Sequence, residues 1–316
     1  MIDASVLVVG GGAIGGVTAA KLTGAVRRVV VLDASEEHVA RLNDGLKLDE
    51  LGKERTVKIE ATTTPPDEAF DFVLVTLKAA HHDAVKPLKG TFVSLGNGLV
   101  QERLEQLVGQ GNLISGIVEW GATNLGPGHL AQTTSGPFVV GPPSDRTQRL
   151  AEVLAPAGEV RVADDIDSVI WAKLLVNSVF SGLGAVAGQT YAEVVANPAG
   201  RDVALRMWRE GYEVGLAQGL HPGKVLGVES AALAEGDTKA LATAMEGHGA
   251  TYASMLQDLE RGALTEVDVI DGAVVEKGRE QGIPTPLHER VTELIHASER
   301  GERAPSPDAL AELERL

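Results

Sequence analysis

The chain has 316 residues, of which 44% are hydrophobic and only 3% aromatic, and its formal net charge is −16. This length and apolar content are sufficient for two domains with separate cores. The negative charge and the lack of a basic run exclude a nucleic-acid partner, because phosphate backbones attract Lys and Arg. The chain has no cysteine, which excludes disulfide bonds and thiolate chemistry.

The N-terminal segment has the order of residues that a dinucleotide site requires. An apolar, β-branched run leads into a Gly-x-Gly-x-x-Gly turn, and a helical pattern follows. The three glycines are Gly10, Gly12 and Gly15. The first permits a tight turn, the second lets the backbone approach a pyrophosphate, and the third allows close packing of helix on strand. The N–H groups of Ala13 and Ile14 would then face the phosphates. The alternative is a glycine-rich turn without a ligand.

Asp33 closes the next predicted strand, 18 residues after the last of these glycines. An acidic residue that binds the ribose is expected about 20 residues on. Its carboxylate would accept a hydrogen bond from the 2′-OH of NAD and repel the 2′-phosphate of NADP. Glu36 and Glu37 add negative charge, while Arg27 and Arg28 enter the strand at its opposite end. The sequence therefore predicts a preference for NADH.

The rest of the first half alternates between strands and helices. Strands are predicted at 56–61, 72–76, 92–95, 113–120 and 160–162, and helices at 35–42, 83–88, 99–108 and about 145–154. After the turn Gly126-Pro127-Gly128, residues 129–134 and 138–141 are expected to form an antiparallel hairpin. Because ligands bind beyond the carboxyl ends of parallel strands, Lys78 and Asn97 are expected to meet the glycine turn in one crevice.

From residue 165 onward the pattern is overwhelmingly helical. We therefore predict a Rossmann-type α/β domain at 1–166 and an all-α domain at 167–316. The richness of the second half in Ala, Val and Leu favours a homodimer through this domain. The N-terminus lacks the basic region of a signal peptide, and no uninterrupted apolar run of ~18 residues is present, so we expect a cytoplasmic protein without a membrane partner.

One predicted helix of the second half, 168–181 with Asp167 as its N-cap, is apolar over most of its circumference. Lys173, Asn177 and Ser181 stand at i, i+4 and i+8 and form a polar stripe. The stripe either presents an ammonium to a polar ligand, or the lysine stem packs on the core while its head reaches water. Glu266, at the border of a later apolar stripe, is likewise either a ligand group or a solvated first-turn residue.

The order of these motifs resembles the ketopantoate (2-dehydropantoate) reductase family. The matching blocks are Gly-x-Gly-x-x-Gly, Val-Thr-Leu-Lys78, Gly-Asn97-Gly, Trp171-x-Lys173-x-x-x-Asn177, Ser254-Met-Leu-Gln-Asp258 and Thr265-Glu266-x-Asp268. In that family a Rossmann domain is joined to an all-helical domain like the C-terminal domain of 6-phosphogluconate dehydrogenase. A ketone is reduced in the cleft between the two domains.

The resemblance implies roles for individual residues. Lys173 would be the catalytic acid that protonates the carbonyl oxygen, and Glu266 would orient the substrate. Asn97 would lie between the nicotinamide ribose and the substrate, and Lys78 on the cofactor side. The remaining substrate-binding residues would be Asn177, Ser181 and Ser254. This set implies reduction of a small branched 2-oxo acid, ketopantoate or a relative, to the 2-hydroxy acid.

The chain departs from the family at two places. Where the family commonly carries a second asparagine followed by proline, this chain has Ser181-Gly182, and a hydroxyl does not reach as an amide does. The family norm is NADPH, bound through a basic residue near the end of the second strand, where this chain has Asp33. The alternative functions are an opine-type or β-hydroxyacid dehydrogenase, or a non-catalytic NAD-binding sensor or scaffold. No metal site is expected, since the eight histidines are scattered.

Overall fold

The computed structural model describes residues 1–316. The chain divides into two compact units, Met1–Gly96 with Val100–Ile166, and Asn97–Leu99 with Asp167–Leu316. The short segment Asn97–Leu99 therefore packs with the helical unit. The backbone N–H of Leu99 donates to the carbonyl oxygen of Val269 at 2.8 Å. Gly98 has a φ of +80°, and a Cβ on it would lie 2.5 Å from the same carbonyl oxygen, so this position requires glycine.

The first unit is built on an eight-stranded sheet. In spatial order its strands are β12 (Val160–Val162), β11 (Phe138–Gly141), β8 (Leu113–Val118), β7 (Lys89–Ser94), β6 (Ala69–Val75), β1 (Ile2–Val9), β2 (Val26–Leu32) and β5 (Glu60–Thr62). The six strands from β8 to β5 are parallel and follow the strand order of a Rossmann fold. The strand order reverses between β1 and β6, which is where such sheets bind their ligands.

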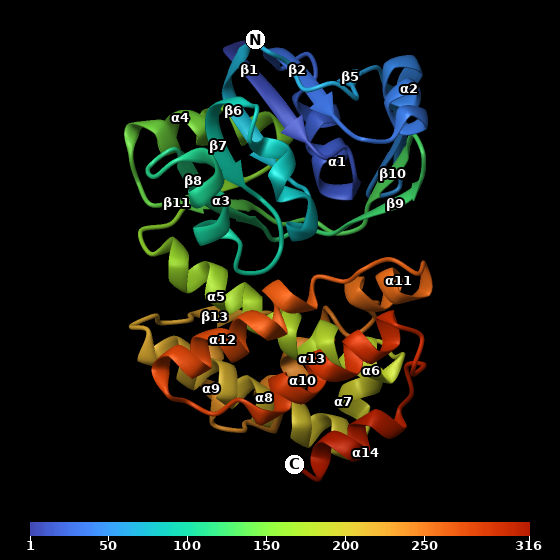
Figure 1. Cartoon of the computed structure of the whole chain (residues 1–316), viewed down its shortest axis with the longest axis vertical. Helices are drawn as coiled ribbons and strands as arrows, with labels where there is room; N and C mark the ends of the chain where they lie inside the picture. Colours follow the sequence, from blue (N-terminus) through green and yellow to red (C-terminus); the bar gives the residue numbers. More distant parts are fainter. The chain divides into compact units, whose positions relative to one another are not determined.

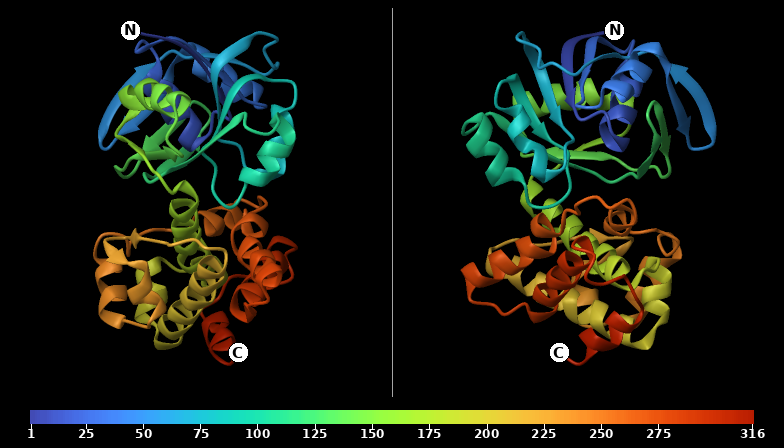
Figure 2. Two further views of the ribbon diagram at one scale, coloured as in Figure 1. Left: turned by 90° about the vertical axis from the view of Figure 1, so that its left-hand side faces the viewer. Right: turned by 45° about the vertical axis from the view of Figure 1, so that its right-hand side comes forward.

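Helices cover both faces of this sheet. They are α1 (Ala13–Leu22), α2 (Glu36–Gly45), α3 (Gln101–Val108) and α4 (Asp145–Leu154), with the 3₁₀ turns η1 (Ala79–Val85) and η2 (Ala155–Ala157). Figure 2 shows α3 and α4 on opposite sides of the strands. The central strands read as continuous apolar runs because both of their faces are buried. Ser35, the first residue of the predicted helix 35–42, caps α2, its side chain accepting from the N–H of His38.

A second, four-stranded sheet corrects two predictions. Its order is β4 (Lys53–Val57), β3 (Leu46–Glu50), β10 (His129–Gln132) and β9 (Ala122–Gly126). The predicted hairpin of 129–134 with 138–141 is wrong, because β10 pairs with β9 and β3, whereas β11 pairs with β8 and β12. The turn at Gly126-Pro127-Gly128, with positive φ at both glycines, connects β9 to β10 instead.

The predicted strand 56–61 is also wrong as a single element. Its first part belongs to β4 and its last part to β5, and these strands lie in different sheets. Between them the N–H of Ile59 donates to the carbonyl oxygen of Leu42 in α2, and the Ile59 side chain is buried. The alternation of apolar and polar residues over 56–61 therefore spans parts of two strands that pair with different neighbours. The predicted helix at 83–88 is instead the 3₁₀ turn η1, which begins and ends earlier.

The second unit is almost entirely helical (Figure 1). Its helices are α5 (Ile166–Val176), the π-helical turn η3 (Asn177–Ser181), α6 (Gly182–Ala187), α7 (Tyr191–Ala196), α8 (Pro198–Ala217), α9 (Ser230–Ala234), α10 (Thr238–Glu246), α11 (Ser254–Glu260), the 3₁₀ turn η4 (Val267–Val269), α12 (Asp271–Gln281), α13 (Pro286–Glu299) and α14 (Asp308–Glu314). Two short strands, β13 (Lys224–Val225) and β14 (Val228–Glu229), form a hairpin. The core of this helical unit contains the buried side chains of Trp171, Phe180 and Trp208.

Segments α5, η3 and α6 form one continuous helix, which differs from the sequence prediction at its start and in its middle. It begins at Ile166, so Asp167 lies in the first turn and is not the N-cap. The turn Asn177–Ser181 is π-helical and not α-helical. By length and composition the helix could cross a membrane, with a mean hydropathy of 1.6, but 78% of that stretch is buried. Because buried core helices meet the same criterion, this is weak evidence for a membrane span.

Candidate active site

The glycine turn has the conformation that its sequence predicts. Gly10, directly after β1, has a φ of +99°. A Cβ on Gly15 would lie 2.0 Å from the carbonyl oxygen of Gly10 and 2.3 Å from Oγ1 of Thr76, so only glycine fits. A Cβ on Gly12 would meet nothing within 4 Å. The backbone at Gly12 therefore borders open space, as a close approach to a pyrophosphate requires.

The start of α1 also suits an anion. Gly12 is its N-cap and provides no side-chain hydrogen bond to the first turn. The N–H groups of Ala13 and Ile14 are therefore not capped by the residue that most often does so. Backbone N–H groups in this position, at the positive end of a helix dipole, bind phosphate groups. The glycine turn and α1 together fit a dinucleotide cofactor.

Asp33 and His38 hold the peptide groups of Gly11 from two directions. The N–H of Gly11 donates to Oδ2 of Asp33 at 2.7 Å, and Ser35 N–H donates to the other carboxylate oxygen at 2.9 Å. The carbonyl oxygen of Gly11 lies 2.7 Å from Nε2 of His38, and the N–H of Gly128 points to Nδ1 of His38 at 3.0 Å. A carbonyl only accepts and an N–H only donates, so His38 is the neutral tautomer with its proton on Nε2.

His38 carries no sequence motif. It is a lone histidine on α2, and its side chain is almost completely buried. Its contact with Gly128 depends on the β9–β10 turn, which is 90 residues away in the sequence. The sequence shows only that His38 lies three residues after the helix cap Ser35. This position does not reveal that the side chain contacts the glycine turn.

Thr76 connects the ends of β1 and β6. Its hydroxyl lies 3.0 Å from the carbonyl oxygen of Val9 and 2.8 Å from that of Gly10. Leu77 follows against Gly10, and Lys78, half-buried, is the N-cap of η1. The structure thus brings the predicted cofactor-side segment that contains Lys78 to the glycine turn at the point where the strand order reverses.

Asn97 and Glu266 meet within the helical unit although they are 169 residues apart. The side-chain Nδ2 of Asn97 donates to Oε2 of Glu266 at 3.4 Å. Glu266 is half-buried and directly precedes η4. The spacing of apolar residues in the sequence does not predict this contact, because the contact depends on the packing of the Asn97–Leu99 segment with Val269.

The polar stripe predicted from Lys173 to Ser181 spans two kinds of helix. Lys173 lies in α5, whereas Asn177 and Ser181 are the first and last residues of the π-helical turn. Lys173 and Asn177 are half-buried, but Ser181 is only 1% exposed. The stripe is therefore most accessible at its N-terminal end. Turns of this kind are frequent at functional sites, and the sequence pattern gave no sign of this one.

Ser181 belongs to a cluster of hydroxyl groups. Its Oγ lies 3.5 Å from Oγ of Ser254, the first residue of α11. Burial raises the pKa of Tyr191 to about 12, and a hydrogen bond with Ser181 opposes that rise. The Ser181 hydroxyl is thus engaged by two protein groups. Tyr191 carries no sequence motif, so its contact with Ser181 could not be predicted.

Family models match both halves of the chain. The model described as ketopantoate reductase PanE/ApbA matches residues 6–145. The model described as ketopantoate reductase PanE/ApbA C terminal matches residues 165–299. The chain belongs to the ketopantoate reductase family. The predicted resemblance is confirmed, and neither the opine-type nor the β-hydroxyacid dehydrogenase alternative is favoured.

Individual relatives support the same family. The 2-dehydropantoate 2-reductases of Mesorhizobium japonicum and Archaeoglobus fulgidus are each 32% identical to the chain, over 94% of its length and 98% of their own. A PanE/ApbA family ketopantoate reductase from Ralstonia eutropha has a TM-score of 0.83 at 26% identity, covering 94% of this chain and 99% of its own. The predicted fold class is confirmed.

A further solved structure shares the fold of this ketopantoate reductase family member. It is D-mandelate dehydrogenase with NADH and anilino(oxo)acetate, with a TM-score of 0.84 at 23% identity. It covers 95% of this chain and 99% of its own length. At this identity the likeness shows the fold alone.

Proposed function

We propose that this protein is a 2-dehydropantoate 2-reductase, which reduces a small branched 2-oxo acid to the 2-hydroxy acid with a nicotinamide cofactor. The proposal rests on the match of both halves of the chain to one family of reductases. The contact between Asn97 and Glu266 adds support, because these two residues are the expected cofactor-proximal amide and the expected substrate-orienting acid.

The proposed mechanism gives a role to five of the candidate residues. The ammonium of Lys173 donates a proton to the carbonyl oxygen, which becomes the product hydroxyl. Glu266, held by the amide of Asn97, orients the substrate. Asn177 binds the substrate, and Ser254 hydrogen-bonds its carboxylate. When bound, the nicotinamide supplies the hydride that completes the reduction at C2.

Steady-state kinetics test this function. 2-Dehydropantoate and a panel of other 2-oxo acids are offered with NADH and with NADPH. The Lys173→Ala variant should lower kcat on the best substrate by at least about a hundredfold, the range for loss of a general acid. Lys239→Ala, on an exposed lysine of α10, is the matched control and should leave kcat unchanged. The proposal would be contradicted if Lys173→Ala retained the full kcat, or if the wild type reduced none of the 2-oxo acids.

We further propose that NADH is preferred over NADPH. Asp33 stands at the end of β2, where the adenosine ribose binds in such sheets, and two backbone N–H groups hold its carboxylate in place. Each carboxylate oxygen retains a lone pair that can accept a hydrogen bond from a ribose 2′-OH. Arg28, the nearest basic residue on this strand, is bound by Glu60 and Glu68.

The oligomeric state and the cellular location of the protein can also be proposed. A ketopantoate reductase from Staphylococcus aureus, with a TM-score of 0.76 at 18% identity, is described as dimeric. We propose a homodimer through the helical unit and a cytoplasmic location. Light scattering coupled to size-exclusion chromatography measures the mass, which should be twice the 33.0 kDa of one chain; a mass of one chain would contradict the dimer.

A further inference from the structure

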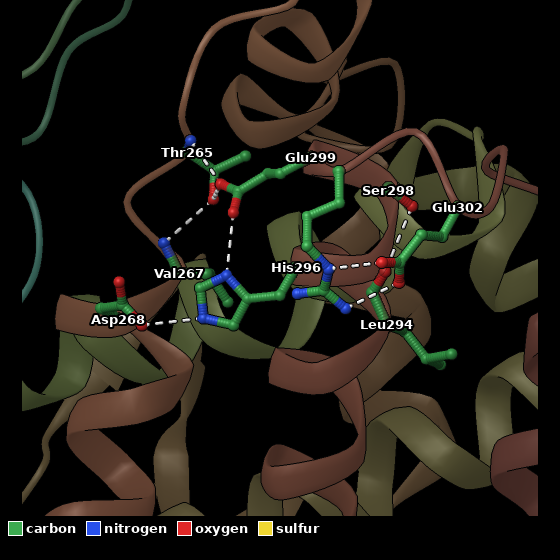
Figure 3. Close-up of polar contacts among 9 residues, drawn as sticks. Thr265, Val267, Asp268, Leu294, His296, Ser298, Glu299 and Glu302 are labelled. Carbon is green, nitrogen blue, oxygen red and sulfur yellow. Dashed lines mark hydrogen bonds and ion pairs between the residues drawn. The ribbon is translucent and has the colours of Figure 1, made fainter.

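The imidazole of His296, in α13, lies between two carboxylates (Figure 3). Its Nδ1 is 2.8 Å from Oε2 of Glu299, and its Nε2 is 2.9 Å from Oδ1 of Asp268. A neutral imidazole has a single N–H and can donate to only one of these groups. The observed arrangement therefore requires the imidazolium, which has an N–H on each nitrogen.

The two carboxylates hold the backbone on either side of Glu266. The other oxygen of Glu299 accepts from the N–H and the hydroxyl of Thr265, both at 2.8 Å. The Thr265 hydroxyl in turn accepts from the N–H of Val267 at 3.2 Å. Asp268 lies within η4, which begins directly after Glu266. One imidazolium thus connects the residue before Glu266 to the second residue after it (Figure 3).

The charges around His296 favour its protonated form. Burial lowers the pKa of His296, but the hydrogen bond to Glu299 and the charge of Asp268 outweigh burial and raise the pKa overall. The facing charged groups are Glu299 on its own helix and Asp268 on η4. Arg300, at the end of α13, forms its ion pair with Glu302. Loss of the proton would leave an imidazole lone pair facing one carboxylate.

We propose that His296 is a positioning residue whose proton holds Glu266 in place for the 2-oxo acid, so that substrate affinity falls when this proton is lost. The inference rests on the proposed function, because it takes Glu266 as the group that orients the substrate. His296 itself acts only through Asp268, Glu299 and Thr265.

Hydrogen exchange tests the positioning without any turnover. Protection factors of the amides in 265–269 are measured by mass spectrometry between about pH 6 and 9. In the wild type, protection should fall as the pH rises. His296→Gln should show the low protection at every pH, because its single amide group carries no charge. His248→Gln, on an exposed histidine in the same unit, is the matched control and should follow the wild type. Wild-type protection in His296→Gln would overturn the inference.

Kinetics then test the consequence for the substrate. The KM of the wild type for its best 2-oxo acid should rise several-fold over the same pH range. His296→Gln should have the raised KM already at pH 6, with a smaller change in kcat and an unchanged Kd for NADH. If His296→Gln retains the wild-type KM profile while the enzyme turns over, the inference fails and the proposed function stands. If no 2-oxo acid is reduced, the proposed function fails and the substrate part of the inference fails with it, whereas the exchange measurement still decides whether His296 holds the backbone of residues 265–269.

Discussion

The imidazole of His38 donates a hydrogen bond from Nε2 to the carbonyl oxygen of Gly11, at 2.7 Å. Its other nitrogen accepts from the N–H of Gly128 at 3.0 Å. The side chain therefore joins the glycine turn to the β9–β10 turn. The N–H of Gly11 is at the same time bound by Asp33, so both peptide groups of this glycine are fixed from outside the turn.

Replacement of His38 should weaken dinucleotide binding. His38→Leu leaves a buried carbonyl at Gly11 and a buried N–H at Gly128 without partners, which costs about 1–3 kcal/mol for each group. We expect a Kd for NADH about tenfold higher, measured by fluorescence titration, and a lower free energy of unfolding in urea. His248→Leu changes an exposed histidine of the other unit and should alter neither quantity. An unchanged Kd in His38→Leu would show that the turn is held without this side chain.

Neutralising Asp33 should shift the cofactor preference toward NADPH. Asp33→Asn retains one acceptor oxygen but removes the charge that repels a 2′-phosphate. We expect the ratio of the two Kd values, NADPH over NADH, to fall about tenfold, or about 1.4 kcal/mol. Asp44→Asn removes the same charge from an exposed position on α2 and serves as control. A ratio equal to that of the wild type would contradict the role of Asp33.

An added charge at Asn97 should reduce activity. Asn97→Asp places a carboxylate beside Oε2 of Glu266, where the amide now donates at 3.4 Å. Like charges repel, so Glu266 should move from its position, and kcat/KM should fall at least about tenfold. Gln110→Glu makes the same change of an amide to a carboxylate at an exposed residue and should leave kcat/KM unaltered. Equal values for both variants would argue against a functional contact.

The buried pair of Asp271 and His288 should make stability depend on pH. Both side chains are 0% exposed, and Nδ1 of His288 lies 3.2 Å from Oδ1 of Asp271. Burial raises the pKa of Asp271 to about 6. Burial lowers the pKa of His288, but the hydrogen bond and charge of Asp271, together with the charge of Glu210 and the carbonyl of Met207, outweigh burial and raise that pKa overall. The contribution of His288 is then complete below about pH 6.5, its ordinary value, and is lost as the pH rises through the folded-state pKa.

Chemical denaturation measures this dependence. Between about pH 6.5 and 8.5 the free energy of unfolding should fall more in the wild type than in the double variant Asp271→Ala, His288→Leu. At pH 6.5, His288→Leu alone should cost about 3–5 kcal/mol, because it leaves a buried carboxylate unpaired. The double variant should lose less than the sum of the two single variants. Parallel pH curves and additive losses would show that the pair is not coupled.

The sequence was sufficient for the elements that carry strong local signals. The strand, glycine turn and helix around Gly12, the cap at Ser35 and the bounds of α4 all follow from patterns within a few residues. The hairpin prediction failed because β10 and β11 are close in the chain but find partners in different sheets. Such pairing depends on the hydrophobic faces of distant strands and not on the connecting residues.

Local patterns also identified candidate site residues, but they did not identify the residues that contact them. Lys173 and Asn177 follow from helical spacing, and Glu266 from its position beside an apolar stripe. The partners of these regions, such as Asn97 for Glu266 and His296 for Asp268, come from segments 28 to 169 residues away. The backbone hydrogen bonds that create the π-helical turn leave no mark in the spacing of polar side chains. These features become visible only when the packing is known.

The π-helical turn at Asn177–Ser181 acts as an inserted residue inside an otherwise regular helix. In an α-helix each residue advances the direction of its side chain by about 100°. A π turn, with its i→i+5 hydrogen bonds, winds more widely and absorbs the extra residue, so removal of one residue from it would restore regular winding and leave Lys173 and the buried Leu183 in nearly the same relative directions. Such a deletion would leave the apolar core and Lys173 in place, and it would change only which side chains the turn between Asn177 and Ser181 presents.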